Sequence, residues 1–354
     1  MCSPGRPPAF RGVDTSVIAV TLRSDYFRDS FEYNFPGYLT SMSAIEILGL
    51  EKTYSVGFWR KRPKCALRPL NLAVENGEIF GFLGPNGAGK TTTLKLLMGL
   101  VLPTSGSARI LGMELDDPRM KAQIGFLPEQ PYFYDYLTAR ELLKYYGQLS
   151  GVEASQLAEK VDKALERVSL RDAADIQLRK FSKGMLQRAG IAQAILHDPK
   201  VVFLDEPMSG LDPMGRREVR DLIEELKRQG KTVFFSTHIL SDAEALCDRV
   251  AVIHQGELRG VGHVAELTSS VAGKVELIWN GRAVPAGLTG LGAECHVIGE
   301  TIRAVLPEGQ QEAALEILRR ERLRLISLTP VRTSLEEYYL QKVSPEAMPA
   351  VGAR

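Results

Sequence analysis

Residues 84–92 read Gly84-Pro85-Asn86-Gly87-Ala88-Gly89-Lys90-Thr91-Thr92, and this stretch decides the fold. It follows an apolar run at 79–83 and precedes a stretch whose apolar residues recur at helical spacing. The pattern GxxxxGK[ST] between a strand and a helix is a phosphate-binding P-loop, in which glycines let several backbone N–H groups point at one phosphate. We expect Lys90 to neutralise the β- and γ-phosphates, Thr91 to ligate Mg²⁺ and Thr92 to support the α-phosphate side. This pattern predicts nucleotide binding, but it does not separate kinases, GTPases, helicases and transporters.

A second apolar run, at 201–204, ends in two acids, Asp205 and Glu206. Fully buried parallel strands have this composition, and ligands bind beyond their carboxyl ends. We expect Asp205 to hold Mg²⁺, directly or through water. Glu206 is expected to polarise the water that attacks the γ-phosphate.

Residues 181–188 read Phe-Ser-Lys-Gly-Met-Leu-Gln-Arg and lie just upstream of this second run. They resemble the signature of the ABC transporter ATP-binding subunits, whose usual form is LSGGQ followed by a helix. All the family's motifs occur in family order across residues 43–265. The other matching segments are 50–54 on the adenine side, the D-loop at 209–212, and 232–238, the strand that leads to the switch histidine.

The resemblance implies roles for five further residues. The ring of Tyr54 would stack on adenine, and His238 would contact the γ-phosphate. Ser182, Gly184 and Met185 would contact the nucleotide that the opposite subunit holds, since a helix N-terminus with a small hydroxyl is an anion site. One chain carries one P-loop and one signature, so the resemblance implies a head-to-tail homodimer that sandwiches two ATP molecules.

The sequence departs from the family pattern at two places. Where the family presents a glutamine to Mg²⁺, Glu129 takes that place and Gln130 follows it. A carboxylate remains a plausible metal ligand, and either residue is a candidate for sensing the metal. In the signature, Lys183 replaces a glycine and Met185 replaces a glutamine. This variant resembles a branch of bacterial exporters that act on drugs, ions such as sodium, lipids or polysaccharides.

The expected fold class is α/β, a P-loop NTPase of the ABC ATPase type with a mainly parallel sheet, a helical subdomain and an antiparallel edge near the N-terminus. A small α+β domain is expected to follow it, because 274–279, 301–306 and 323–328 have strand-like patterns whereas 312–320 and 334–340 have helix-like ones. Residues 1–42 lack periodicity and predict an unstructured tail or a misassigned start, with Met42 as the true initiator. The expected divisions are a tail at 1–42, the ATPase domain at 43–265, the accessory domain at 266–343 and a second tail at 344–354.

The composition bears on partners and location. Among 354 residues, 44 Lys and Arg nearly balance 43 Asp and Glu, which argues against a nucleic-acid partner. No apolar run approaches the roughly 20 residues that span a bilayer. The four scattered cysteines predict unpaired thiols, most of them buried. We therefore expect a cytoplasmic protein on the inner face of the cell membrane, acting with a separate multi-span permease.

Two questions stay open at this stage. The aromatic stretch at 131–136 either docks the permease or packs inside the helical subdomain. The function is either to drive that permease or, alternatively, that of a soluble ABC ATPase with no transporter. Translation-type relatives carry two ATPase units in one chain and DNA-maintenance relatives carry long heptad segments, and this sequence has neither feature.

Overall fold

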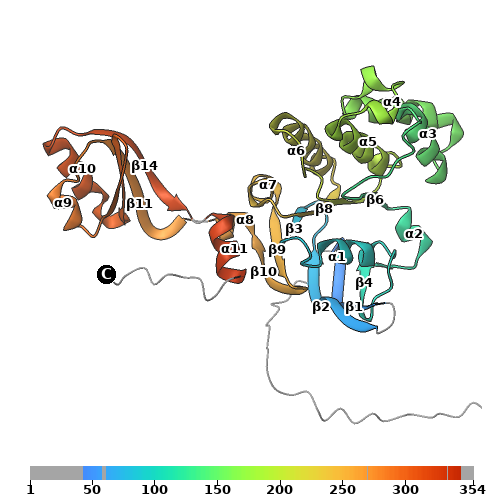
Figure 1. The fold of residues 1–354 in the computed structure, drawn as a ribbon, viewed down its shortest axis with the longest axis horizontal. Helices are drawn as coiled ribbons and strands as arrows, with labels where there is room; N and C mark the ends of the chain where they lie inside the picture. The colour runs from blue at the N-terminus through green and yellow to red at the C-terminus, as the bar shows by residue number, and fades with distance from the viewer. Residues whose placement is uncertain (1–42, 58–60, 269, 333, 344–354) are drawn as a thin grey trace, which may run out of the picture. The chain divides into compact units, whose positions relative to one another are not determined.

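The computed structural model describes residues 43–57, 61–268, 270–332 and 334–343. The described residues form three β-sheets with their helices (Figure 1). The predicted tails at 1–42 and 344–354, and the proposed initiator Met42, lie outside the described residues. Each described helix is too short or too polar to cross a membrane.

A six-stranded sheet carries the motifs, in the strand order β10-β9-β3-β8-β7-β6. All its neighbours pair in parallel except β10, which runs antiparallel to β9 at one edge. The predicted mainly parallel sheet is therefore confirmed. The strands are β3 (Ile79–Leu83), β6 (Ile124–Leu127), β7 (Val201–Asp205), β8 (Thr232–Thr237), β9 (Arg249–His254) and β10 (Glu257–His263).

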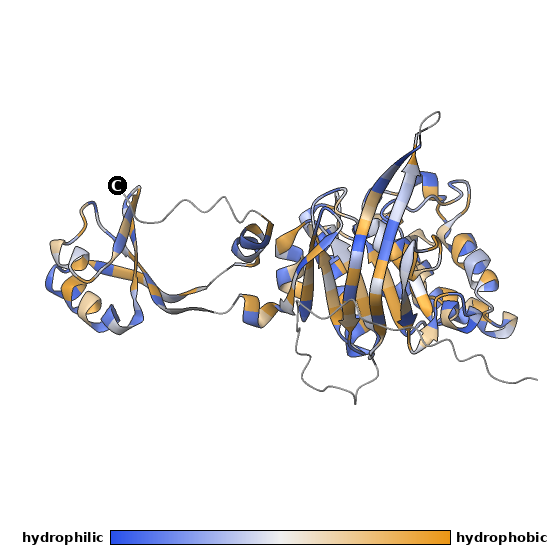
Figure 2. Ribbon diagram, turned by 90° about the horizontal axis from the view of Figure 1, so that it is seen from below, coloured by the Kyte–Doolittle hydropathy of each residue, from blue (hydrophilic) through white to orange (hydrophobic). Residues whose placement is uncertain are grey.

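The central strands of this sheet are buried on both faces, which explains their continuous apolar sequences. In β3, Ile79 and Leu83 enter one hydrophobic core, whereas Phe80 and Phe82 enter another on the opposite face. Figure 2 shows hydrophobic and hydrophilic residues along both the strands and the helices. The first core is covered by α3 (Ala139–Leu149), α4 (Ala154–Arg167), α5 (Lys183–Ile195), α6 (Pro213–Arg228) and α7 (Leu240–Leu246), and the second by α1 (Lys90–Leu97) and α2 (Pro118–Lys121).

The strands near the N-terminus form a sheet of their own, in the order β2-β1-β4-β5, rather than an edge of the parallel sheet. It packs into the second core through buried aliphatic residues such as Ile45 and Leu67. The register of the β1–β2 hairpin pairs Thr53 with Cys65 and Tyr54 with Lys64. The strands are β1 (Ile45–Val56), β2 (Arg62–Val74), β4 (Ser105–Ile110) and β5 (Met113–Glu114).

The helical subdomain predicted between the P-loop and the signature is present as α3 and α4. Helix α3 begins with a capping box: the Thr138 hydroxyl accepts from the Glu141 N–H, and the Glu141 carboxylate accepts from the Thr138 N–H. Both pairs satisfy N–H groups that a helix start leaves without a partner.

The predicted C-terminal strands and helices are present, and they surround a third core that includes Leu277, Trp279 and Ile302. The sheet is antiparallel in the order β12-β13-β11-β14, and β12 and α9 had not been predicted. The final helix, α11 (Leu335–Val343), packs instead against α7, α8 (Val264–Leu267), β9 and β10. The other elements are β11 (Ser270–Asn280), β12 (Glu294–Ile298), β13 (Thr301–Pro307), β14 (Arg324–Arg332), α9 (Ala286–Thr289), α10 (Gln311–Arg320) and the 3-10 turns at 171–173, 178–180 and 308–310.

Gly81, in the middle of β3, allows the close approach of Cys247. A β-carbon at Gly81 would lie 2.6 Å from the Cys247 sulfur. We expect Gly81→Ala to lower the free energy of unfolding by about 1–3 kcal/mol, the usual cost of overpacking a core. Adding Cys247→Ala removes the clashing sulfur, so the double variant should be destabilised by less than the sum of the two single variants. Denaturant unfolding of all four proteins measures this coupling, and strict additivity would contradict the packing argument.

Candidate nucleotide-binding and catalytic site

The P-loop connects the end of β3 to the start of α1, as its sequence predicted. Gly89, the residue before the helix, has a φ of 111°, a conformation that glycine adopts without steric cost. A β-carbon at Gly84 would lie 2.4 Å from the Ile253 carbonyl oxygen, and one at Gly89 would lie 2.7 Å from that of Ala66. Neighbouring backbone therefore requires glycine at both positions.

Lys90 opens α1, and its ammonium group is directed back over the loop. Its Nζ donates to the Gly84 carbonyl oxygen at 2.7 Å and lies 3.0 Å from Oε1 of Glu206. Only 6% of each of the two charged side chains is exposed. A buried ion pair of this kind holds the predicted phosphate-binding lysine and the predicted catalytic acid within contact distance.

Glu206 follows the last residue of β7 and turns sharply, with a φ of 50°. That left-handed conformation is strained for a residue with a side chain, and such strain is concentrated at functional sites. The Glu206 N–H donates to the carbonyl oxygen of Ser236 at 3.2 Å and to its hydroxyl at 3.1 Å, which holds the turn against β8. The carboxylate's Oε2 accepts from Nδ1 of His238 at 2.8 Å. The structure thus brings Lys90, Glu206 and His238 together.

Asp205 is the buried last residue of β7, with 1% exposed. Its Oδ1 accepts from the Ser236 hydroxyl at 2.5 Å. Ser236 therefore contacts both predicted acids and keeps them in register across the β7–β8 pair.

A cavity of about 430 Å³ lies over the P-loop. Tyr54, Thr91, Glu129 and Glu206 all line it, so the adenine-side, phosphate-side and metal-side candidates converge on one space. The full lining is Tyr54, Val56, Lys64, Cys65, Ala66, Pro85, Asn86, Gly87, Gly89, Lys90, Thr91, Thr92, Glu129 and Glu206.

Cys65 is a member of this lining that sequence reasoning had assigned to the buried thiols. It is exposed, because the β1–β2 register places it opposite Thr53 at the cavity wall. No local sequence signal marks this position, because it depends on the register of the hairpin. The described cysteines are unpaired as expected, and Cys247 is buried whereas Cys295 is partly exposed.

The loop that follows β6 separates Glu129 from Gln130. Glu129 lines the cavity over the P-loop, whereas Gln130 does not, and its side-chain oxygen accepts from the Tyr132 hydroxyl at 3.0 Å. This geometry favours Glu129 as the residue that faces the nucleotide.

The signature residues are not among those that line the cavity. Ser182 is the exposed N-cap of α5, where its hydroxyl accepts from the Met185 N–H at 3.2 Å. The Lys183 ammonium lies against the D-loop, 2.2 Å from where a β-carbon at Gly210 would be. Ser182, Gly184 and Met185 therefore present a helix N-terminus outside this chain's own nucleotide cavity.

Comparison with known families agrees with this geometry. The family described as ABC transporter matches residues 67–209. An uncharacterized ABC transporter ATP-binding protein from Synechocystis is 42% identical over 305 residues, which cover 85% of each chain. The bacitracin transport ATP-binding protein BcrA of Bacillus licheniformis is 46% identical over 192 residues, 53% of this chain and 62% of that one.

Solved structures show the same fold. An ATP-binding subunit of an ABC transporter has a TM-score of 0.56 at 30% identity, over 64% of this chain and 92% of that one. A dimeric ATP-binding cassette in a post-hydrolysis state with ADP and Pi has a TM-score of 0.57 at 25% identity, over 62% of this chain and 98% of that one.

We expect MgATP to protect Cys65 from alkylation, because nucleotide in the cavity would cover its thiol. At a nucleotide concentration ten times the dissociation constant, the rate should fall about tenfold if the bound form is unreactive. Peptide mass spectrometry of the Glu206→Gln protein measures the rate without turnover. Cys295 is the internal control and should react equally with and without ATP. Cys247 should stay unmodified, since burial raises the pKa of its thiol well above the ordinary value. Equal labelling of Cys65 in both conditions would contradict the assigned cavity.

We expect Glu129→Ala to impair ATP hydrolysis more than Gln130→Ala. Loss of a metal-side carboxylate should lower kcat on the order of tenfold or more. Loss of the Gln130 side chain should lower kcat less, because that side chain bonds to the exposed Tyr132 and does not line the cavity. Steady-state phosphate release at saturating ATP gives both values. The reverse order would exchange the roles of the two residues.

Proposed function

Since this chain belongs to the family of ABC transporter ATP-binding proteins, we propose that it hydrolyses ATP to drive a separate multi-span membrane permease in the direction of export. The proposal rests on the short loop after β6, because its residues line both the nucleotide cavity and a neighbouring groove. Its Glu129 lines the nucleotide cavity, and its neighbours Pro128 and Pro131 line an apolar groove. Changes at the nucleotide therefore have a direct path to a docking surface.

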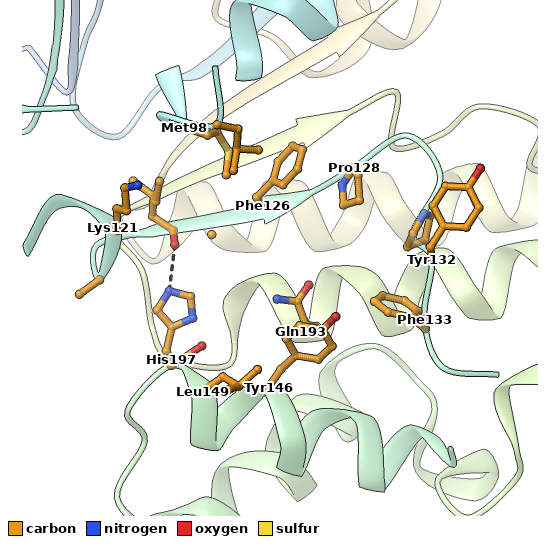
Figure 3. A pocket seen from close by; sticks show the side chains of 16 residues that line it. Met98, Lys121, Phe126, Pro128, Tyr132, Phe133, Tyr146, Leu149, Gln193 and His197 are labelled. Atoms are coloured by element: carbon orange, nitrogen blue, oxygen red, sulfur yellow. Dashed lines mark hydrogen bonds between the residues drawn. The ribbon is translucent and has the colours of Figure 1, made fainter. Parts of the chain in front are cut away.

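The groove has a volume of about 590 Å³. Figure 3 shows Met98, Phe126 and Pro128 along one side, Tyr146 and Leu149 along the other, and Tyr132 near one end. The side chains come from the end of α1, from β6 and its loop, and from α3. A groove bounded by helix and strand elements has a shape that suits a short helix of a partner.

Several large apolar and aromatic side chains that line the groove are exposed to solvent. Tyr132 is 88% exposed, Leu149 66% and Leu100 60%. In contrast, Phe133 packs edge-on against Tyr146, with ring centroids 6.2 Å apart. Within the aromatic stretch at 131–136, Phe133 therefore packs inside the subdomain, whereas the exposed ring of Tyr132 would anchor a partner, as aromatic residues do at interfaces.

Hydrolysis itself would rest on positioning and electrostatics. Lys90 would stabilise charge on the β- and γ-phosphates. Those phosphates would then compete with the Glu206 carboxylate for the Lys90 ammonium. Glu206, released from that ion pair, would polarise the attacking water, with His238 beside it to contact the γ-phosphate. Tyr54, at the far wall of the cavity, would stack on the adenine.

The residues present fit Mg²⁺, which binds hard oxygen ligands and takes one or two from the protein together with substrate phosphates. Thr91 and Glu129 line the same cavity, whereas Asp205 is buried behind it, where its carboxylate accepts from the Ser236 hydroxyl and is not among the lining residues. Bound there, Mg²⁺ would neutralise phosphate charge.

We propose a homodimer in which the signature residues of each copy complete the nucleotide site of the other. Ser182 and Gly184 lie outside their own chain's cavity, and a solved relative of this fold is a dimeric cassette. Export and a place at the inner face of the cell membrane are supported by the exporter-like signature and by a relative named for bacitracin transport.

Co-purification tests the proposal. Tagged Glu206→Gln, expressed in the native host and extracted in mild detergent with ATP, should bring down a stoichiometric multi-span membrane protein. In that background, Leu100→Asp should abolish the association, because it places a charge in the groove. Leu48→Asp is the matched control, since Leu48 is equally exposed (61%) but lies on β1, outside the groove lining. Recovery of ribosomes, DNA or no membrane protein would favour a soluble ABC ATPase without a transporter.

A further inference from the structure

Helix α11 is built into the fold by specific contacts, although it follows the C-terminal sheet in the chain. Ser334 and Glu337 form a capping box at its start, with N–H to side-chain distances of 3.2 and 3.3 Å. Glu244 of α7 accepts from the Leu335 N–H at 3.4 Å, and Leu335 is fully buried in the first core. The helix is therefore anchored to α7, which begins two residues after His238.

Through Tyr339, helix α11 lines a cavity that His238 and the P-loop also line. Tyr339 forms a wall of a cavity of about 290 Å³, whose other walls are three P-loop residues, His238 and Leu240. The Tyr339 ring is partly buried against the first core. The lining is Gly84, Pro85, Asn86, His238, Leu240 and Tyr339.

Within the described part of the chain, the His238 ring is held by a hydrogen bond at Nδ1, to the Glu206 carboxylate. Nδ1 bonds to Oε2 of Glu206 at 2.8 Å, while 40% of the side chain is exposed. The next residue is tied down, since the Ile239 N–H donates to the Thr237 hydroxyl at 3.0 Å. His238 lines the cavity described above, and the Tyr339 ring forms another wall of the same cavity.

We propose that Tyr339 is a positioning residue for ATP hydrolysis, whose ring limits the movement of His238 and so keeps the imidazole on Glu206. The inference rests on the roles proposed above for His238 and Glu206. It extends the hydrolytic machinery to a helix far outside the family-matched residues 67–209. It also gives the accessory domain a covalent route to the site, because only two residues separate the end of β14 from the start of α11.

Tyr338 is a matched control on the same helix. It is also partly buried, but its hydroxyl lies beside Gly260 of β10, and its ring lies under the Lys342 ammonium at 5.5 Å. Tyr338 does not line the cavity that contains His238. Loss of either ring weakens the packing of α11, but only loss of Tyr339 opens the space next to the histidine.

The test is steady-state ATP hydrolysis by the full chain carrying Tyr339→Ala, Tyr339→Leu, Tyr339→Phe or Tyr338→Ala. We expect Tyr339→Ala and Tyr339→Leu to lower kcat about tenfold, as a small misplacement of a catalytic group does, with KM for ATP within about twofold. Tyr339→Phe should retain kcat within about twofold, because the ring and not the hydroxyl forms the wall. Tyr338→Ala should keep kcat and lower only the thermal stability. The Leu variant preserves apolar burial, so it gives the answer should the Ala variant fail to fold.

Three outcomes would overturn the inference: an unchanged kcat in Tyr339→Ala and Tyr339→Leu, an equal loss of kcat in Tyr338→Ala, or a loss of kcat in Tyr339→Phe as large as in Tyr339→Ala. His238→Ala and Glu206→Gln, assayed in the same series, separate this inference from the proposed function. If both remain fully active, the roles proposed for the site itself are wrong. If both are inactive while Tyr339→Leu equals the parent protein, only the role of α11 is wrong.

Discussion

A buried carboxylate at the end of β7 is the constraint on which the rest of the site depends. Glu206 is 5% exposed, and an unpaired charge at that depth would be strongly destabilising. Lys90 from the P-loop and His238, which directly follows β8, contact its two oxygens, while Ser236 holds its backbone. These partners come together because β3, β8 and β7 are parallel neighbours whose carboxyl ends meet at one edge. The parallel register is thus what brings the partners of this buried acid together.

Much of the site could be predicted because its signals are local. Each of three motifs follows a short apolar run, and such runs are typical of buried parallel strands. The motifs are the P-loop, the two acids after 201–204 and the histidine after 232–237. The same reasoning predicted the α/β class and most of the C-terminal elements. It did not predict β12, because the residues of this strand are mostly exposed and do not alternate between buried and exposed positions.

The remaining features depend on contacts between distant segments. Cys65 enters the nucleotide cavity through hairpin register, and the separate antiparallel sheet follows from pairing that no single stretch encodes. The difference between Glu129, which lines the cavity, and Gln130, which does not, depends on the side of the loop that each residue faces. Lys183, unusual for the signature, lies against Gly210, so its charge is accommodated by a glycine 27 positions later. Tyr339 shares a cavity with His238 only because α11 leaves the C-terminal sheet and packs on α7.

The return of α11 also has a consequence for the order in which the polypeptide is made. The surface that α11 covers, around α7, α8 and β10, is complete once Leu267 has been synthesised, but its cover begins only at Leu335. At the usual rate of about 5–20 residues per second, a ribosome needs roughly 3–14 s to add the intervening segment. The C-terminal sheet is completed only when β14 (Arg324–Arg332) has been added, three residues before α11 begins. For nearly all of that interval the sheet lacks its last strand, and the apolar patch that α11 will cover is open to water.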